Sequence, residues 1–134
     1  MPTDDKPNLD LIAMVQKARM EHDAQAKPSQ VSAVYWIEAK RQIDGAAPTA
    51  RAGHWLIRTN VASVDAAWAT IRQATEAGQL GYKSKVATVP LHQRDERSIY
   101  VMTSDADDAP DVERVRVALR DLGFEADLVY ERGD

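Results

Sequence analysis

The stretch from Trp68 to Tyr130 constrains the fold of this chain more than any other part. Its apolar residues change from helical spacing to the twofold spacing of strands and back again. The segments are a helix that ends at Gly78, strands at 83–89 and 98–103, a helix at 107–123 and a strand at 125–131. This order of parts indicates one compact α+β domain.

The two helices of this stretch carry distinct start and stop signals. Ser63 is a good N-cap for the first helix, and the apolar face that follows includes Trp68, so this tryptophan is predicted to lie in the core. Gly78 supplies a left-handed C-terminal residue. The second helix begins at an acidic run with Pro110 in its first turn and ends at Gly123.

The first half of the chain adds further elements. Residues 1–8 are predicted to be a flexible N-terminus, and a helix is expected from about residue 8 to residue 26. Alternating β-formers predict strands at 31–40 and 54–59, which we expect to form a hairpin with a long, mobile connection. The expected fold is a curved, largely antiparallel sheet of about five strands with helices packed on one face, in a single domain of residues 9–134.

The composition excludes several kinds of site. The 134 residues include no cysteine, so there is no disulfide, thiolate zinc site or thiol nucleophile. His22, His54 and His92 lack the spacing of a metal motif, and we expect no metal and no cofactor. The apolar runs are too short for a membrane span, so the sequence favours a cytoplasmic protein without a membrane partner.

The charge is distributed unevenly along the chain. The net charge of −4 argues against non-specific nucleic-acid binding. Residues 40–97, however, contain nine Lys and Arg side chains and five Asp and Glu side chains, which gives a local balance of +4. This middle segment has the charge to hold an anion if its basic groups share one face, whereas scattered basic groups would only solvate the surface.

Tryptophans and basic residues supply the candidate contacts for such an anion. Trp36 and Trp55 lie on predicted strands, where each either stacks a flat ligand or packs in the core. Lys83 and Lys85 share one face of a regular strand, which is either a phosphate site or a solvated surface. By the same parity His54 and Arg58 share a face that excludes Trp55. Without a bulge in the strand, Trp55 and Arg58 therefore cannot both contact one ligand.

Several short sequence words resemble the basophilic-leukemia-expressed protein family: Tyr35-Trp36-Ile37, Gly53-His54-Trp55, Gly78-x-Leu80-Gly81, Ile99-Tyr100 and Leu128-x-Tyr130. The resemblance covers about residues 32–131, and His54 stands where the family has lysine. It implies a fold similar to the cap-binding translation initiation factor, in which tryptophans stack a base. It also implies a phosphothreonine lyase domain, in which Lys85 would be the base, His54 the acid and Arg58 a phosphate clamp.

Two functions from different classes follow, with a third as the default. The first is a small module that binds a nucleotide or other phosphorylated ligand, including a phosphopeptide, on the concave sheet face. Its candidate contacts are Trp36, Lys83, Lys85 and either Trp55 or Arg58. The second is a cofactor-independent phosphothreonine lyase that acts by β-elimination. The default is an interaction domain that binds a protein partner without a small-molecule ligand.

Overall fold

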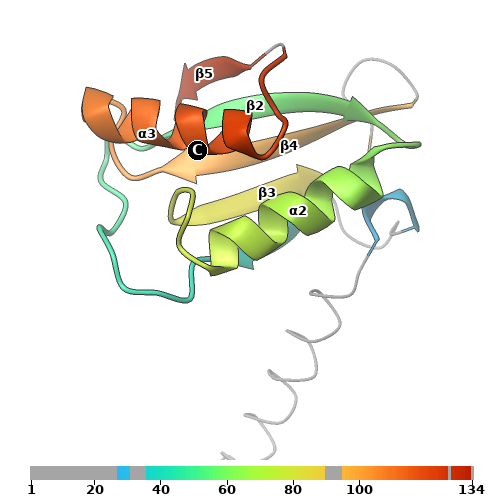
Figure 1. Ribbon diagram of the computed structural model, residues 1–134, viewed down its shortest axis with the longest axis horizontal. Coiled ribbons are helices and arrows are strands. Elements are labelled where there is room, and N and C mark those ends of the chain that lie inside the picture. Colours follow the sequence, from blue (N-terminus) through green and yellow to red (C-terminus); the bar gives the residue numbers. More distant parts are fainter. Residues whose placement is uncertain (1–26, 31–35, 90–94, 127, 134) are drawn as a thin grey trace, which may run out of the picture.

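The computed structural model describes residues 27–30, 36–89, 95–126 and 128–133, and its elements are shown in Figure 1. The strands are β1 (Trp36–Lys40), β2 (Gly53–Asn60), β3 (Lys83–Ala87), β4 (Glu96–Thr103) and β5 (Val129–Arg132). The helices are α2 (Val64–Glu76), α3 (Ala109–Asp121) and the short 3-10 helix η1 (Pro28–Gln30). The flexible segment expected at 1–8 and the helix expected at 8–26 lie outside the described residues.

The strands form one open five-stranded sheet in the order β1-β3-β4-β2-β5. Every neighbouring pair is antiparallel, which confirms the α+β class expected from the sequence. Helices α2 and α3 lie on the same side of the sheet (Figure 1). Their apolar residues join those of the strands in one core, so this face of the sheet is closed to solvent.

The predicted hairpin between the first two strands is wrong. β1 pairs with β3 and β2 pairs with β4, so two strands separate β1 from β2 in the sheet. A long connection lacks the short turn that forces two consecutive strands to be neighbours. The connection is also tied down: the amide of Thr49 donates to the carbonyl of Ser104 at 2.9 Å, and Ser104 Oγ donates to the carbonyl of Ala46 at 2.9 Å.

The helix ends follow the sequence signals with one exception. Gly78 and Gly123 have φ values of 79° and 100°, and the Asp108 carboxylate accepts from the Asp111 amide at the start of α3. Ser63 occupies the N-cap position of α2, but its side chain makes no capping hydrogen bond because its φ and ψ of −110° and −15° are already helical. The carboxylate of Asp65 instead binds η1 and accepts hydrogen bonds from the amide and hydroxyl of Ser29.

The core contains the tryptophan that the sequence assigned to it. Trp68 is 2% exposed on the apolar stripe of α2, between the helix and the sheet. The hydroxyl groups of Thr75 on α2 and Ser84 on β3 lie 2.7 Å apart in a buried hydrogen bond. Within the part of the chain that the structure describes, no helix has the length and apolar character needed to cross a membrane.

Candidate functional site

The sheet face opposite the helices collects most of the polar candidates. Side chains alternate between the two faces of a strand, so the strand register identifies the residues that share this face. They are Trp36, Glu38 and Lys40 of β1, Lys83, Lys85 and Ala87 of β3, Glu96, Ser98, Tyr100 and Met102 of β4, His54, Leu56, Arg58 and Asn60 of β2, and Val129 and Glu131 of β5. We call this surface the helix-free face.

An aromatic and cationic cluster lies across three strands of this face. The Nζ atom of Lys85 is 4.3 Å from the centroid of the Trp36 ring and 5.5 Å from that of Tyr100. The rings of Trp36 and Tyr100 meet edge to face, with their centroids 5.2 Å apart. Trp36 is 37% exposed, so a large part of its indole is accessible at the surface. Such a contact between a cation and an aromatic face is attractive and fixes the ammonium group over the ring.

His54 adjoins this cluster but is buried. Its ring lies 4.8 Å from that of Tyr100, measured between centroids, and its Nδ1 lies 2.9 Å from the carbonyl oxygen of Gly133. That distance makes Nδ1 the protonated nitrogen, because a carbonyl can only accept. The imidazole is 5% exposed, and its buried Nε2 has no hydrogen-bond partner among the described residues. His54 therefore supports Tyr100 from below the surface.

Tyr100 and Arg58 complete the chemistry of this face. The pKa of the Tyr100 phenol is raised above its ordinary value, first by burial and then by the carboxylates of Glu131 and Glu96. The positive charge of Arg58 acts in the opposite direction on the same pKa. The phenol is therefore a neutral hydrogen-bond donor at neutral pH. Arg58 is exposed on β2, opposite Ser98 of β4.

Trp55 does not belong to this surface, which corrects its assignment as a candidate ligand contact. Its side chain is 8% exposed on the helix-covered face, and its Nε1 donates to the carbonyl of Val112 in α3 at 3.1 Å. Its ring also meets the ring of Tyr130 edge to face, with centroids 5.1 Å apart. The parity argument is confirmed, because Arg58 and His54 lie on one face and Trp55 on the other. The tryptophan of the helix-free face is Trp36.

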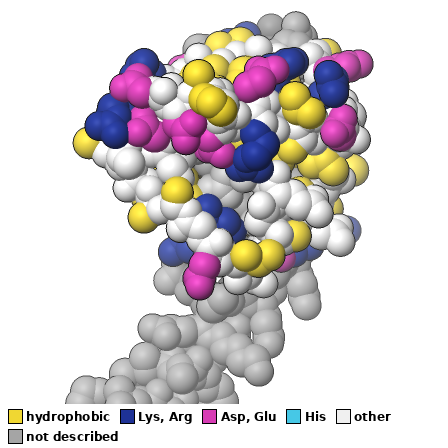
Figure 2. Space-filling model, turned by 60° about the vertical axis from the view of Figure 1, so that its left-hand side comes forward, with side chains coloured by type: hydrophobic (Ala, Val, Ile, Leu, Met, Phe, Trp, Pro, Cys, Tyr) yellow, Lys and Arg dark blue, Asp and Glu magenta, His cyan; other side chains and the backbone are white. Residues whose placement is uncertain are grey.

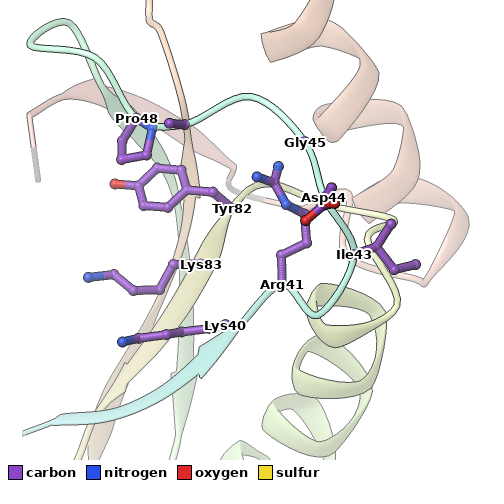
Figure 3. Close-up of a pocket in the computed structure, with 9 residues that line it drawn as sticks. Lys40, Arg41, Ile43, Asp44, Gly45, Pro48, Tyr82 and Lys83 are labelled. Carbon is purple, nitrogen blue, oxygen red and sulfur yellow. The ribbon is translucent and has the colours of Figure 1, made fainter.

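Lys83 lies at a different end of the helix-free face from Trp36. It is directly opposite Lys40 in the register of β1 and β3, and its Nζ is 3.6 Å from a carboxylate oxygen of Glu38. Both lysines border a cavity of about 440 Å³, which the loop after β1 also lines. Figure 3 shows the side chains of Lys40, Lys83 and Tyr82 extending to the same side of this cavity. We call this cavity the lysine pocket.

Arg41 lines the lysine pocket but is committed to the loop. Its Nη2 donates to the carbonyl of Ala46 at 3.1 Å, and a side chain added at Gly45 would press against its guanidinium group. In Figure 3 the guanidinium lies beside Asp44, away from the ammonium groups of Lys40 and Lys83. Arg41 therefore shapes the pocket wall.

A second cavity, of about 420 Å³, is acidic but has no available carboxylate cluster. Asp105 accepts two hydrogen bonds from Arg51 Nε and a third, at 2.7 Å, from Nη2, and the pKa of Asp105 is lowered by this pairing. Asp111 pairs with Arg114 at 2.9 Å, and Asp108 caps α3. Among the described residues no group of His, Asp and Glu has the arrangement of a metal site. Capping and ion pairing account for these acids.

The basic residues of the middle segment do not all share one face. Four of them, Lys40, Arg58, Lys83 and Lys85, lie on the helix-free face. Others are paired elsewhere, as Arg72 is with Glu76 at 3.3 Å along α2. Figure 2 shows basic and acidic side chains lying next to one another across the upper part of one end of the molecule. The basic residues of the middle segment therefore contribute to part of the helix-free face and do not form a uniform basic patch.

Sequence reasoning missed three residues of this region. Tyr100, Glu38 and Lys40 were not assigned a role, although all three line the helix-free face. Side chains alternate between the two faces of β1, which places Trp36, Glu38 and Lys40 on one side. This pattern could have identified Glu38 and Lys40 from the sequence. The position of Tyr100 between Lys85 and Leu56 depends on the strand order, which the sequence did not reveal.

Comparison with known proteins places the chain in a family. The family model described as "Basophilic leukemia-expressed protein Bles03" matches residues 8–130, which is most of the chain. No curated protein matches the chain. The match includes all of the strands of the helix-free face as far as Tyr130. The chain belongs to the basophilic leukemia-expressed protein Bles03 family.

Proposed function

We propose that the helix-free face binds a small phosphorylated ligand with a flat ring, of which a nucleotide is the simplest example. The observation that carries this proposal is the position of Lys85, whose Nζ lies 4.3 Å from the centroid of the partly exposed Trp36 ring. The part of the indole that Lys85 does not cover offers a stacking surface to a base, and the adjacent ammonium offers a positive charge to its phosphate.

The remaining residues of the cluster fit the same ligand. The exposed guanidinium of Arg58 lies on the same face and is suited to two-pronged binding of a phosphate. The neutral phenol of Tyr100, adjacent to Lys85 in the register, can donate a hydrogen bond. The sequence resemblance implies a fold similar to the cap-binding initiation factor, which stacks bases on tryptophans, and this implication motivates the choice of a ring-bearing ligand. The net charge of −4 favours a small ligand over a long nucleic acid.

Isothermal titration with nucleoside monophosphates at low salt tests this proposal. Trp36→Ala is expected to weaken binding by about 1–3 kcal/mol, which is the contribution of one stacked base. Lys85→Met is expected to weaken binding of the monophosphate but not of the unphosphorylated nucleoside. Affinity is expected to fall as salt rises, because exposed charges are screened within about 10 Å at 0.1 M ionic strength.

Arg120→Gln is the matched control for the loss of one positive charge. Arg120 lies on α3, on the helix-covered side of the sheet, and its side chain is 47% exposed. Its removal is expected to leave the affinity unchanged. Circular dichroism spectra of each variant confirm that the fold persists. The proposal fails if no nucleotide binds at low salt, or if binding is indifferent to both Trp36 and Lys85.

A further inference from the structure

The lysine pocket contains a pair of like charges that the fold itself does not explain. Lys40 and Lys83 lie directly opposite each other in the antiparallel register of β1 and β3. Side chains in such positions have Cβ atoms about 5 Å apart, and like charges there destabilise the sheet. Figure 3 shows both side chains extending toward the same side.

The surrounding acids neutralise only part of this charge. Glu38 contacts Lys83 at 3.6 Å, but its side chain is 44% exposed and the pair is screened by solvent. Asp44 also lines the pocket, where Figure 3 places it beside Arg41 instead of the lysines. The three basic residues of the pocket lining therefore outnumber its one acid, Asp44. A multivalent anion placed between Lys40 and Lys83 would relieve their repulsion.

We propose that the lysine pocket binds a polyphosphate group, with Lys40 and Lys83 as the residues that contact it. The volume of about 440 Å³ is within the usual range for small-molecule pockets and larger than one phosphate requires. Tyr82 extends beside Lys83 in Figure 3 and places a phenol at the same opening. A di- or triphosphate fits the size of this space and can offer one phosphate to each lysine.

The pocket lies on the helix-free face, near the proposed ring-binding position at Trp36, and to that extent the inference rests on the proposed function. Trp36 and Lys40 lie on the same face of β1, four residues apart, which corresponds to about 13 Å at 3.3 Å per residue. A nucleoside triphosphate stacked on Trp36 is long enough to place its terminal phosphates in the lysine pocket. Glu38 lies between the two positions and would repel the intervening phosphates.

This arrangement predicts opposite effects from neighbouring substitutions. In isothermal titration of the whole protein with inorganic tripolyphosphate, at low salt and with a chelator present, Lys40→Met and Lys83→Met are each expected to weaken binding about tenfold. This is the scale of one charge-assisted contact that solvent partly screens. Glu38→Gln is expected to tighten binding severalfold, because it removes a repelling carboxylate and releases Lys83. Arg120→Gln, on α3, is expected to have no effect.

The ligand series separates this inference from the proposed function. Tripolyphosphate contains no ring, so its binding reports the lysine pocket alone, whereas binding of a nucleoside monophosphate and its loss in Trp36→Ala report the ring site. If tripolyphosphate binds through Lys40 and Lys83 while monophosphates do not bind, the polyphosphate site is supported and the ring-binding site at Trp36 is refuted. Any of three results would overturn the pocket assignment. They are no binding of tripolyphosphate, binding that does not change when either lysine is replaced, and weaker binding in Glu38→Gln.

Discussion

The two buried tryptophans permit a matched test of how hydrogen bonding stabilises this fold. Trp55 and Trp68 are 8% and 2% exposed, and both belong to the core between the helices and the sheet. Their indole nitrogens differ in hydrogen bonding. Trp55 Nε1 donates to the carbonyl of Val112 at 3.1 Å, whereas the buried Nε1 of Trp68 has no partner among the described residues. The same substitution, tryptophan to phenylalanine, should therefore have different costs at the two positions.

The magnitude follows from the two environments. Both substitutions remove the same atoms, so their cavity terms are similar and largely cancel in the difference. Trp55→Phe also loses a hydrogen bond with a net contribution of about 0.5–1.5 kcal/mol. Trp68→Phe removes a buried, unpaired donor whose desolvation costs about 1–3 kcal/mol. Trp55→Phe is therefore expected to destabilise the protein by about 1.5–4.5 kcal/mol more than Trp68→Phe.

Urea unfolding followed by circular dichroism measures this difference directly, and thermal unfolding checks it. A domain of this length changes its Tm by roughly 3 °C per kcal/mol, so the two variants should melt about 5–14 °C apart. Trp68→Ala provides the scale for complete truncation, with an expected loss of about 3–5 kcal/mol. Equal free energies of unfolding for the two phenylalanine variants, or a larger loss at Trp68, would refute the reasoning. An unchanged stability in Trp68→Ala would show that this residue is not part of the core.

Three further outcomes are expected. Gly81→Ala should lower the free energy of unfolding by roughly 1–3 kcal/mol in urea, because the added Cβ would collide with the carbonyl oxygen of Met102; wild-type stability would contradict this. The raised pKa of Tyr100 favours its protonated form in the folded state, so stability should fall as pH rises through that pKa, above the ordinary value of about 10. This part of the alkaline loss should be absent from the Tm profile of Tyr100→Phe, and an identical profile in both proteins would exclude the effect. Because His54 is buried and Lys85 lies over Trp36, we expect a phosphothreonine peptide to keep its mass on incubation, and loss of phosphoric acid in mass spectra would revive the lyase hypothesis.

Local features were the predictable part of this fold. The helix-ending roles of Gly78 and Gly123 and the start of α3 at an acidic run with an early proline depend on a few adjacent residues, and the structure confirms all three. Strand parity is equally local, so Lys83 and Lys85 lie on one face as expected. Trp68 also lies in the core, because its helical stripe specifies one buried side.

Strand order was the part that local patterns could not supply. The segments of β1 and β2 are each recognisable as strands, but no short turn between them specifies their pairing. For that reason the sequence did not show that Tyr100 lies between Lys85 and Leu56, or that Lys40 faces Lys83. The candidate contacts could be named one by one from parity, while their assembly into one surface required the sheet.

The strand order also has a consequence for how a newly made chain matures. Among the described strands, only β3 and β4 are neighbours both in the chain and in the sheet. β2 can pair only after β4 has been made. Thr103 of β4 and its hydrogen-bond partner Gly53 of β2 are 50 residues apart, and closing so long a loop is slow. β5 follows all the other strands and covers the outer edge of β2. Until β5 docks, that edge presents unpaired amides and carbonyls to other nascent chains, so we expect forms cut before Val129 to self-associate.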